Sequence, residues 1–372
     1  MLEPLKVIGG QESYFTGKLE TYLRAKGIAY QNVPFTMETL QEAASHTGFM
    51  QIPQVVCADG SWLVDTTLII DYLDDRYPEP VTSPTDPAAR FIALLLEDYA
   101  DEWMWRPAMH YRWSFESSSD LMSAWLAEHL PDMAISPEEK KAFWLARQRG
   151  TFVDGDGVSD ETRAAVESSY RHALTALEAI FQHRDYILGD RPTQADFGFM
   201  GPMFRHFFCD PEPARIMRET APAVHEWVAR MWNLRPRRFS SAAQIEALPA
   251  DIGYLLEPVL SAYLPYLAAN QAAVIAQQPQ VSYHALGVNW TEPTKPYRLW
   301  CLDQLRKRYR VLTGASKSSI ADLVGSEHLD RLLSTGPTGH CDHLFGALPY
   351  GASEAARPVF SSWGSRGDSG DS

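Results

Sequence analysis

The order of apolar patterns in the first 80 residues constrains the fold most strongly. Short strand patterns at 5–8 and 28–33 alternate with helical patterns, and Asp59-Gly60-Ser61 joins two further strand patterns. An Asp-Gly pair between apolar runs is a strong indicator of a hairpin, so these two strands are expected to pair antiparallel. The predicted order is β-α-β-α-β-β-α. An antiparallel pair closing a βαβ unit leaves few plausible folds.

Helical patterns replace the strands after Asp86. The sequence predicts a long helix over 88–111 with a kink at Pro107, followed by helices over 120–150, 160–183, 193–208 and 222–232. A third segment follows Pro249. It is expected to contain a helix over 251–278, a β-rich patch around 281–286, and helices near 298–312 and 317–334.

Composition limits the partners and the compartment. Lys plus Arg number 33 against 47 Asp plus Glu, and the resulting net charge of −14 argues against nucleic-acid binding. Apolar runs such as 91–96 are far too short to span a membrane. The few, scattered cysteines predict a reducing, cytoplasmic location without a disulfide framework, and the cysteine and histidine spacing predicts no metal site.

Four short motifs occur in an order that resembles the cytosolic glutathione S-transferase family. They are Ser13-Tyr14-Phe15-Thr16-Gly17-Lys18, Ile52-Pro53, Asp65-Thr66 and Thr193-Gln194-Ala195-Asp196. They resemble, in turn, the S-P-F-S-x-K motif, the cis-proline, the acidic-residue-and-serine pair, and the S/T-x-x-D capping box of that family. The resemblance covers residues 1 to about 240. The stretch 18–24 is also similar to the metaxin-like branch, several members of which are not known for transferase activity.

The resemblance implies a fold class and a division of the chain. An α/β thioredoxin-like domain is expected over 1–80, and an all-α helical domain over 86–245. We expect a mostly helical C-terminal extension over 250–350 to pack on the helical domain, since no Gly/Ser-rich linker precedes it. Residues 353–372 are rich in Ser and Gly and are expected to form a disordered tail.

Ser13 is the candidate catalytic residue. A free thiol has a pKa near 8.5, and lowering it by two units requires about 2.7 kcal/mol of thiolate stabilisation. A charge-assisted hydrogen bond from a hydroxyl supplies about 1.5–3 kcal/mol, and a helix N-terminus adds up to about 1. The alternative for Ser13 is an ordinary loop serine. Thr16 is expected to cap the helix and not to act as a second catalytic hydroxyl. Residues 13–16 include no cysteine, which excludes disulfide exchange.

Four further residues are expected to bind glutathione. A cis Ile52-Pro53 bond, which rests on the resemblance alone, would direct the Ile52 backbone towards the cysteinyl unit. Asp65 and Thr66 stand at a predicted helix start, where free N–H groups suit a carboxylate and Asp65 can pair with the ligand's ammonium. The alternative for Asp65-Thr66 is a helix cap without a ligand.

The second substrate is expected to meet an aromatic wall. The stretch 103–113 carries several aromatic residues, and in the family this helix borders the pocket for the electrophile. Trp105 is our candidate there; the other aromatic residues are expected to pack in the core, with Arg106 and Arg112 paired to acids. The loop 154–160 is expected to be a solvated acidic loop.

These observations predict a glutathione S-transferase-like protein that adds the glutathione thiolate to a hydrophobic small-molecule electrophile, with a homodimer as a possible assembly. Two alternatives stay open. One is glutathione-dependent isomerisation, ether cleavage or dehalogenation at the same site. The other is a non-catalytic binding or assembly protein that keeps the fold.

Overall fold

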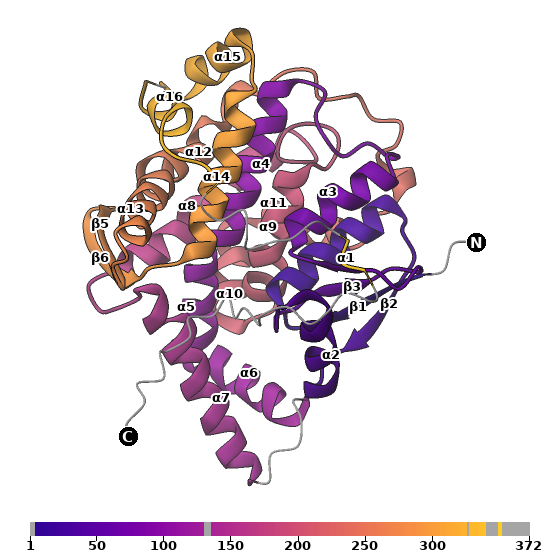
Figure 1. Ribbon diagram of the computed structural model, residues 1–372, viewed down its shortest axis with the longest axis vertical. Coiled ribbons are helices and arrows are strands. Elements are labelled where there is room, and N and C mark those ends of the chain that lie inside the picture. The colour runs from indigo at the N-terminus through magenta and orange to yellow at the C-terminus, as the bar shows by residue number, and fades with distance from the viewer. Residues whose placement is uncertain (1–3, 130–134, 326, 340–348, 352–372) are drawn as a thin grey trace.

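The computed structural model describes residues 4–129, 135–325, 327–339 and 349–351 (Figure 1). Its N-terminal part is a four-stranded sheet in the order β2-β1-β3-β4, with β1 parallel to β2 and antiparallel to β3. The elements are β1 Leu5–Gly9, α1 Tyr14–Lys26, β2 Tyr30–Pro34, α2 Met37–Thr47, β3 Gln54–Val56, β4 Trp62–Val64 and α3 Thr66–Arg76. This confirms the thioredoxin-like domain and the β3–β4 hairpin predicted from the Asp-Gly turn.

Helix α1 begins earlier than the sequence suggested. Ser13, not Thr16, is its N-cap: Ser13 has an extended backbone, and its hydroxyl oxygen accepts a hydrogen bond from the Thr16 backbone N–H at 3.3 Å. The Thr16 hydroxyl is buried and packs against Gly9. Helix α1 ends at Gly27, which adopts a left-handed conformation with φ of 69°.

The second part is all-helical, as expected. It comprises α4 Pro87–Glu102, α5 Trp105–Trp113, α6 Glu116–His129, α7 Pro137–Phe152, α8 Arg163–Phe181, α9 Gln194–Pro202, α10 Pro211–Thr220 and α11 Pro222–Trp232. The predicted kink at Pro107 is wrong: the break falls between Glu102 and Trp105. Pro107 lies in the first turn of α5, where its missing N–H costs no intrahelical hydrogen bond. Helix α10 was not predicted.

The Thr193–Asp196 capping box at the start of α9 is confirmed. Asp196 is fully buried; one carboxylate oxygen accepts from the Ile187 N–H and the other from the Thr193 N–H, both at 2.9 Å. Burial raises the pKa of Asp196 to about 6. The carboxylate therefore joins the loop before α9 to the helix start.

We expect Asp196→Ala to reduce the free energy of unfolding by about 2 kcal/mol or more, because two buried backbone donors lose their acceptor, at about 1–3 kcal/mol each. Urea denaturation measures this change. Asp160→Ala, at an exposed aspartate, is the control and should change stability by less than about 0.5 kcal/mol. Equal denaturation midpoints for the two variants would contradict the structural role of Asp196.

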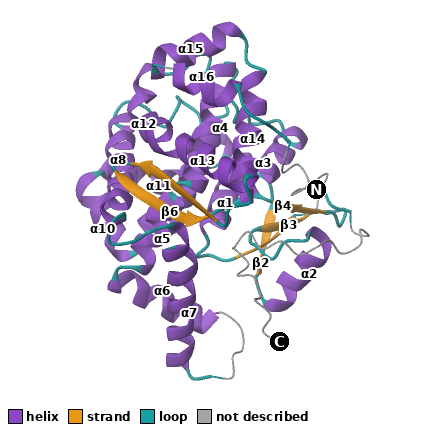
Figure 2. Cartoon of the chain, turned by 60° about the vertical axis from the view of Figure 1, so that its left-hand side comes forward, coloured by secondary structure: helices purple, strands orange, loops and turns teal. Residues whose placement is uncertain are grey.

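The C-terminal extension is α12 Gly253–Pro258, α13 Leu264–Ile275, β5 Gln280–Ala285, β6 Val288–Pro293, α14 Pro296–Arg310, α15 Gly314–Val324 and α16 Glu327–Ser334. The predicted β-rich patch is a two-stranded hairpin, set apart from the main sheet (Figure 2). The single helix predicted over 251–278 is instead two helices joined by a π-helical turn, Val259–Tyr263. Residues 353–372 lie outside the described residues.

The extension contacts both preceding parts. Helix α14 lies beside α4 (Figure 1), and one continuous buried cluster includes Leu19 of α1, Leu95 of α4 and Leu302 of α14. Arg308 of α14 also pairs with Asp71 of α3 at 2.7 Å. No helix within the described residues is long and apolar enough to cross a membrane.

Candidate functional site

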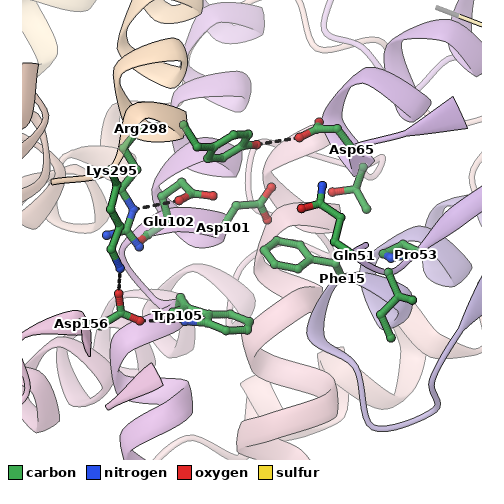
Figure 3. Close-up of a pocket in the computed structure, with 13 residues that line it drawn as sticks. Phe15, Gln51, Pro53, Asp65, Asp101, Glu102, Trp105, Asp156, Lys295 and Arg298 are labelled. Atoms are coloured by element: carbon green, nitrogen blue, oxygen red, sulfur yellow. Dashed lines mark hydrogen bonds and ion pairs between the residues drawn. The ribbon is translucent and has the colours of Figure 1, made fainter. Parts of the chain in front are cut away.

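A cavity of about 120 Å³ opens where the thioredoxin-like domain, the helical domain and the extension meet (Figure 3). It is lined by Phe15, Gln51, Ile52, Pro53, Asp65, Thr66, Asp101, Glu102, Trp105, Asp156, Lys295, Tyr297 and Arg298. Five of the six residues singled out in the sequence lie here: Ile52, Pro53, Asp65, Thr66 and Trp105. The sixth, Ser13, does not line the cavity.

The Ile52-Pro53 peptide bond is cis, as the resemblance implied. It immediately precedes β3 and forms one side of the cavity together with Gln51. In Figure 3, Gln51, Pro53 and Asp65 occupy the same side. This side presents the end of a strand and the start of helix α3 to any bound molecule.

Asp65 is held by three hydrogen bonds. One carboxylate oxygen accepts from the N–H groups of Thr67 and Leu68, both at 3.1 Å, so Asp65 caps α3. The other oxygen accepts from the Tyr297 hydroxyl at 2.7 Å. Burial raises the pKa of Asp65, although these hydrogen bonds oppose the effect. Asp65 is thus both a helix cap and the contact point of the extension.

Ser13 is half-buried, in the loop that leads into α1. Its oxygen accepts from Thr16, and its own proton has no acceptor among the described residues. The side chain that α1 sends into the cavity is Phe15, which stacks on Trp105 with ring centroids 5.6 Å apart. The aromatic wall predicted around Trp105 therefore includes a residue from the other domain.

Lys18, the basic residue of the first motif, is fully buried between two acids of α4. Its ammonium lies 2.7 Å from Glu97 and 2.5 Å from Asp101. Asp101 lines the cavity, and its second oxygen has no hydrogen-bond partner among the described residues. Burial raises the pKa of Asp101, and Lys18 opposes the change. Lys18 therefore fixes α1 to α4 directly behind the cavity.

The side of the cavity opposite Pro53 is charged (Figure 3). Arg298 of α14 pairs with Glu102 of α4 at 2.9 Å, and Lys295 pairs with Asp156. Asp156 also accepts from the Trp105 indole N–H at 3.0 Å. The expectation of a solvated loop is wrong for Asp156, which is only 1% exposed because these two partners enclose it.

The expected ion pairs of α5 are present. Arg106 pairs with Glu292 of the hairpin, and Arg112 pairs with Asp210 at 2.8 Å. Arg106 and Glu292 are both fully buried, at 1% and 0% exposure of their side chains. The extension is therefore joined to the helical domain by a charge pair that water does not reach.

Sequence reasoning missed eight cavity residues: Phe15, Gln51, Asp101, Glu102, Asp156, Lys295, Tyr297 and Arg298. Asp101 and Glu102 carried a usable signal, because they are charged residues at the end of a helix that contains a long apolar run, 91–96. The three cavity residues of the extension, Lys295, Tyr297 and Arg298, carried no such signal apart from their position at the helix start near Pro296. Only the folded chain brings them to Asp65, Glu102 and Asp156.

Comparison with known proteins follows the same domain order. Residues 9–81 match the family model of the glutathione S-transferase N-terminal domain, and residues 160–230 match that of the C-terminal domain. An isoprene-epoxide–glutathione S-transferase from Rhodococcus sp. strain AD45 is 22% identical over 204 residues, covering 54% of this chain and 82% of that relative.

Among solved structures, a glutathione S-transferase from Rhodospirillum rubrum F11 is 19% identical with a TM-score of 0.42, covering 66% of this chain and 94% of that chain. The β-etherase LigF from Sphingobium sp. strain SYK-6 is 18% identical with a TM-score of 0.44, covering 62% and 95%. Residues 9–81 and 160–230, which include the four motifs, are therefore identified as the N- and C-terminal domains of the glutathione S-transferase family, in the family's order.

Proposed function

We propose that this protein binds glutathione and transfers its thiolate to an electrophile held in the same cavity. The observation that carries the proposal is that Ile52, Pro53, Asp65 and Thr66 all line one cavity. The aromatic rings of Phe15 and Trp105 line the same cavity. Glutathione is an extended peptide with charged ends, and a strand end beside a helix start offers backbone pairing and free N–H groups for both.

Each residue has a proposed part in binding. The Ile52 backbone would pair with the cysteinyl unit, while Thr66 and the N-terminus of α3 would hold the γ-glutamyl carboxylate. The ligand's ammonium would approach Asp65, whose carboxylate already accepts from Tyr297. The unpartnered oxygen of Asp101 adds negative charge to the same cavity.

Ser13 remains the proposed thiolate stabiliser. Its oxygen is engaged by Thr16 but its proton is free to be donated, and it stands at the N-terminus of a thirteen-residue helix, α1. A hydroxyl donor combined with a helix N-terminus stabilises a sulfur anion. The ligand thiol would have to lie at the edge of the cavity, between Ser13 and Phe15.

One relative suggests a class of electrophile to test first. The Rhodococcus relative is named for an epoxide, so a small epoxide is a reasonable test substrate. Isomerisation, ether cleavage and dehalogenation would use the same thiolate and are assayed alongside it.

A non-catalytic binding protein is the second candidate. Two observations favour it: Ser13 does not line the cavity, and Tyr297 already occupies one oxygen of Asp65. Glutathione binding without thiolate formation at neutral pH would support this candidate over the enzyme.

We expect Thr66→Val to weaken glutathione binding about fivefold, because the loss of one hydrogen bond costs about 1 kcal/mol. Isothermal titration of glutathione into each variant measures this. Thr67→Val is the matched control: the Thr67 hydroxyl bonds to Glu97 at 3.2 Å and does not line the cavity, so its loss should leave the affinity unchanged. Absence of binding to the wild type would overturn the proposed function.

A further inference from the structure

The charged side of the cavity is supplied largely by a segment outside both matched domains. Lys295 ends the loop after β6, and Tyr297 and Arg298 lie in the first turn of α14. Both domain models end before residue 240, so nothing in the family assignment gives these residues a role. Their side chains reach the cavity through contacts to Asp156, Asp65 and Glu102.

Of the proton-bearing groups on this side, Lys295 is the one suited to proton transfer. Tyr297 donates its proton to Asp65, and burial beside that carboxylate raises the pKa of Tyr297 well above its ordinary value. Arg298 holds its protons at any physiological pH. A lysine ammonium carries three donors and can give one up.

The surroundings of Lys295 set opposing influences on its proton. Burial and the guanidinium groups of Arg298 and Arg106 lower the pKa of Lys295 well below its ordinary value, and the Glu102 carboxylate opposes this shift. The Asp156 carboxylate lies in contact with the Lys295 ammonium. The Lys295 side chain lines the cavity and remains 25% exposed. The Trp105 indole N–H donates a hydrogen bond to Asp156 and fixes its carboxylate. Because Lys295 pairs with the same carboxylate, its ammonium lies close to the Trp105 side chain.

We propose that Lys295 is a catalytic proton donor for electrophiles whose reacting carbon carries an oxygen, such as epoxides. This role rests on the proposed function, because it requires glutathione thiolate on the Pro53 side of the cavity. Figure 3 shows Lys295 on the opposite side from Pro53, with Trp105 and Phe15 between them. An electrophile lying on these two rings would have the sulfur on one side and the ammonium on the other.

In the proposed step, attack by sulfur is coupled to proton transfer onto oxygen. The thiolate forms a sulfur–carbon bond while the carbon–oxygen bond breaks and leaves its electron pair on oxygen. That oxygen takes a proton from the Lys295 ammonium, and the neutral amine then recovers a proton from water. Asp156 positions Lys295 and stabilises the ammonium once it has reformed.

Two electrophiles separate this role from a structural one. Opening of a small epoxide needs a proton on the departing oxygen, whereas substitution of 1-chloro-2,4-dinitrobenzene releases chloride and needs none. We expect Lys295→Met to lower the ratio of the epoxide kcat to the chloroarene kcat about 100-fold or more, the range of general acid catalysis. Lys295→Arg should give the same loss, because the guanidinium keeps the charge without releasing a proton.

Control variants distinguish the loss of the proton donor from a folding defect. The double variant Lys295→Met/Asp156→Asn leaves no buried unpaired carboxylate and should show the same ratio as Lys295→Met. Lys6→Met, at an exposed lysine of β1, should change neither kcat. Asp101→Asn tests the rival proton source in the cavity.

The outcomes are distinct. An equal loss for both electrophiles, an unchanged ratio in the Lys295 variants, or a ratio that falls with Asp101→Asn instead, would overturn the role of Lys295. Wild-type turnover of the chloroarene but not of the epoxide would overturn the substrate class while leaving the proposed function standing. Wild type that turns over neither would overturn the transferase function itself, and with it the role of Lys295.

Discussion

Replacing Lys18 by methionine should destabilise the protein by about 3–5 kcal/mol. Lys18 is fully buried, and its removal leaves the carboxylates of Glu97 and Asp101 buried without a cation. Breaking a buried ion pair by removing one partner typically has a cost of this size. Methionine is close to lysine in length and fills the space, so the effect reports the charge and not a cavity.

The loss should be smaller at low pH. Burial already raises the pKa of Asp101, and removing the lysine that opposes this shift raises it further. A carboxyl whose pKa is higher in the folded than in the unfolded state contributes stability that is lost as pH rises through the folded pKa. Urea denaturation at pH 5 and pH 8 should therefore show a larger loss at pH 8. A pH-independent loss would contradict this account of Lys18, and Lys18→Met/Asp101→Asn should recover part of the stability.

Ser13→Ala should raise the pKa of bound glutathione by about one to two units, because one charge-assisted hydrogen bond contributes about 1.5–3 kcal/mol. Turnover near neutral pH should fall about 10- to 100-fold and partly recover at higher pH, where the thiol ionises unaided. Affinity for glutathione should be nearly unchanged, since other residues hold the peptide. Ultraviolet absorbance of the thiolate against pH, with glutathione bound, measures the shift.

Because Ser13 also caps α1, Ser13→Ala should cost about 1 kcal/mol of stability. Ser13→Thr keeps both a cap and a donor and should restore the thiolate pKa, which separates chemistry from folding. Thr16→Ala should leave the thiolate pKa unchanged, because the Thr16 hydroxyl packs against Gly9. A Ser13→Ala protein that titrates like wild type would show that Ser13 is not the activating group.

Features coded by neighbouring residues could be predicted from the sequence. The Asp59-Gly60 turn fixed the β3–β4 hairpin, and Gly27 ended α1 in the left-handed conformation that glycine adopts most easily. The Thr193–Asp196 cap lies within four residues of chain. The start of α1 was misplaced because two hydroxyl residues, Ser13 and Thr16, can each cap a helix, and only the backbone conformation decides between them.

Features that depend on distant contacts could not be predicted. The family resemblance placed Asp65 and Thr66 in the binding site. It gave no indication that Asp65 accepts a hydrogen bond from Tyr297, which lies 232 residues further along the chain. Asp156 was misread because its partners Trp105 and Lys295 come from other parts of the chain. Loop composition favours solvent, and only the tertiary fold encloses an acid in that loop.

The Arg106–Glu292 pair has a practical consequence for anyone who shortens this chain to the two recognised domains. A cut near residue 245 would remove Glu292, together with Arg298, the partner of Glu102. The guanidinium of Arg106 and the carboxylate of Glu102 would then face solvent on a surface whose aromatic residues, such as Trp103, lose their cover. A soluble two-domain version would therefore have to be redesigned along α4 and α5, and not merely truncated.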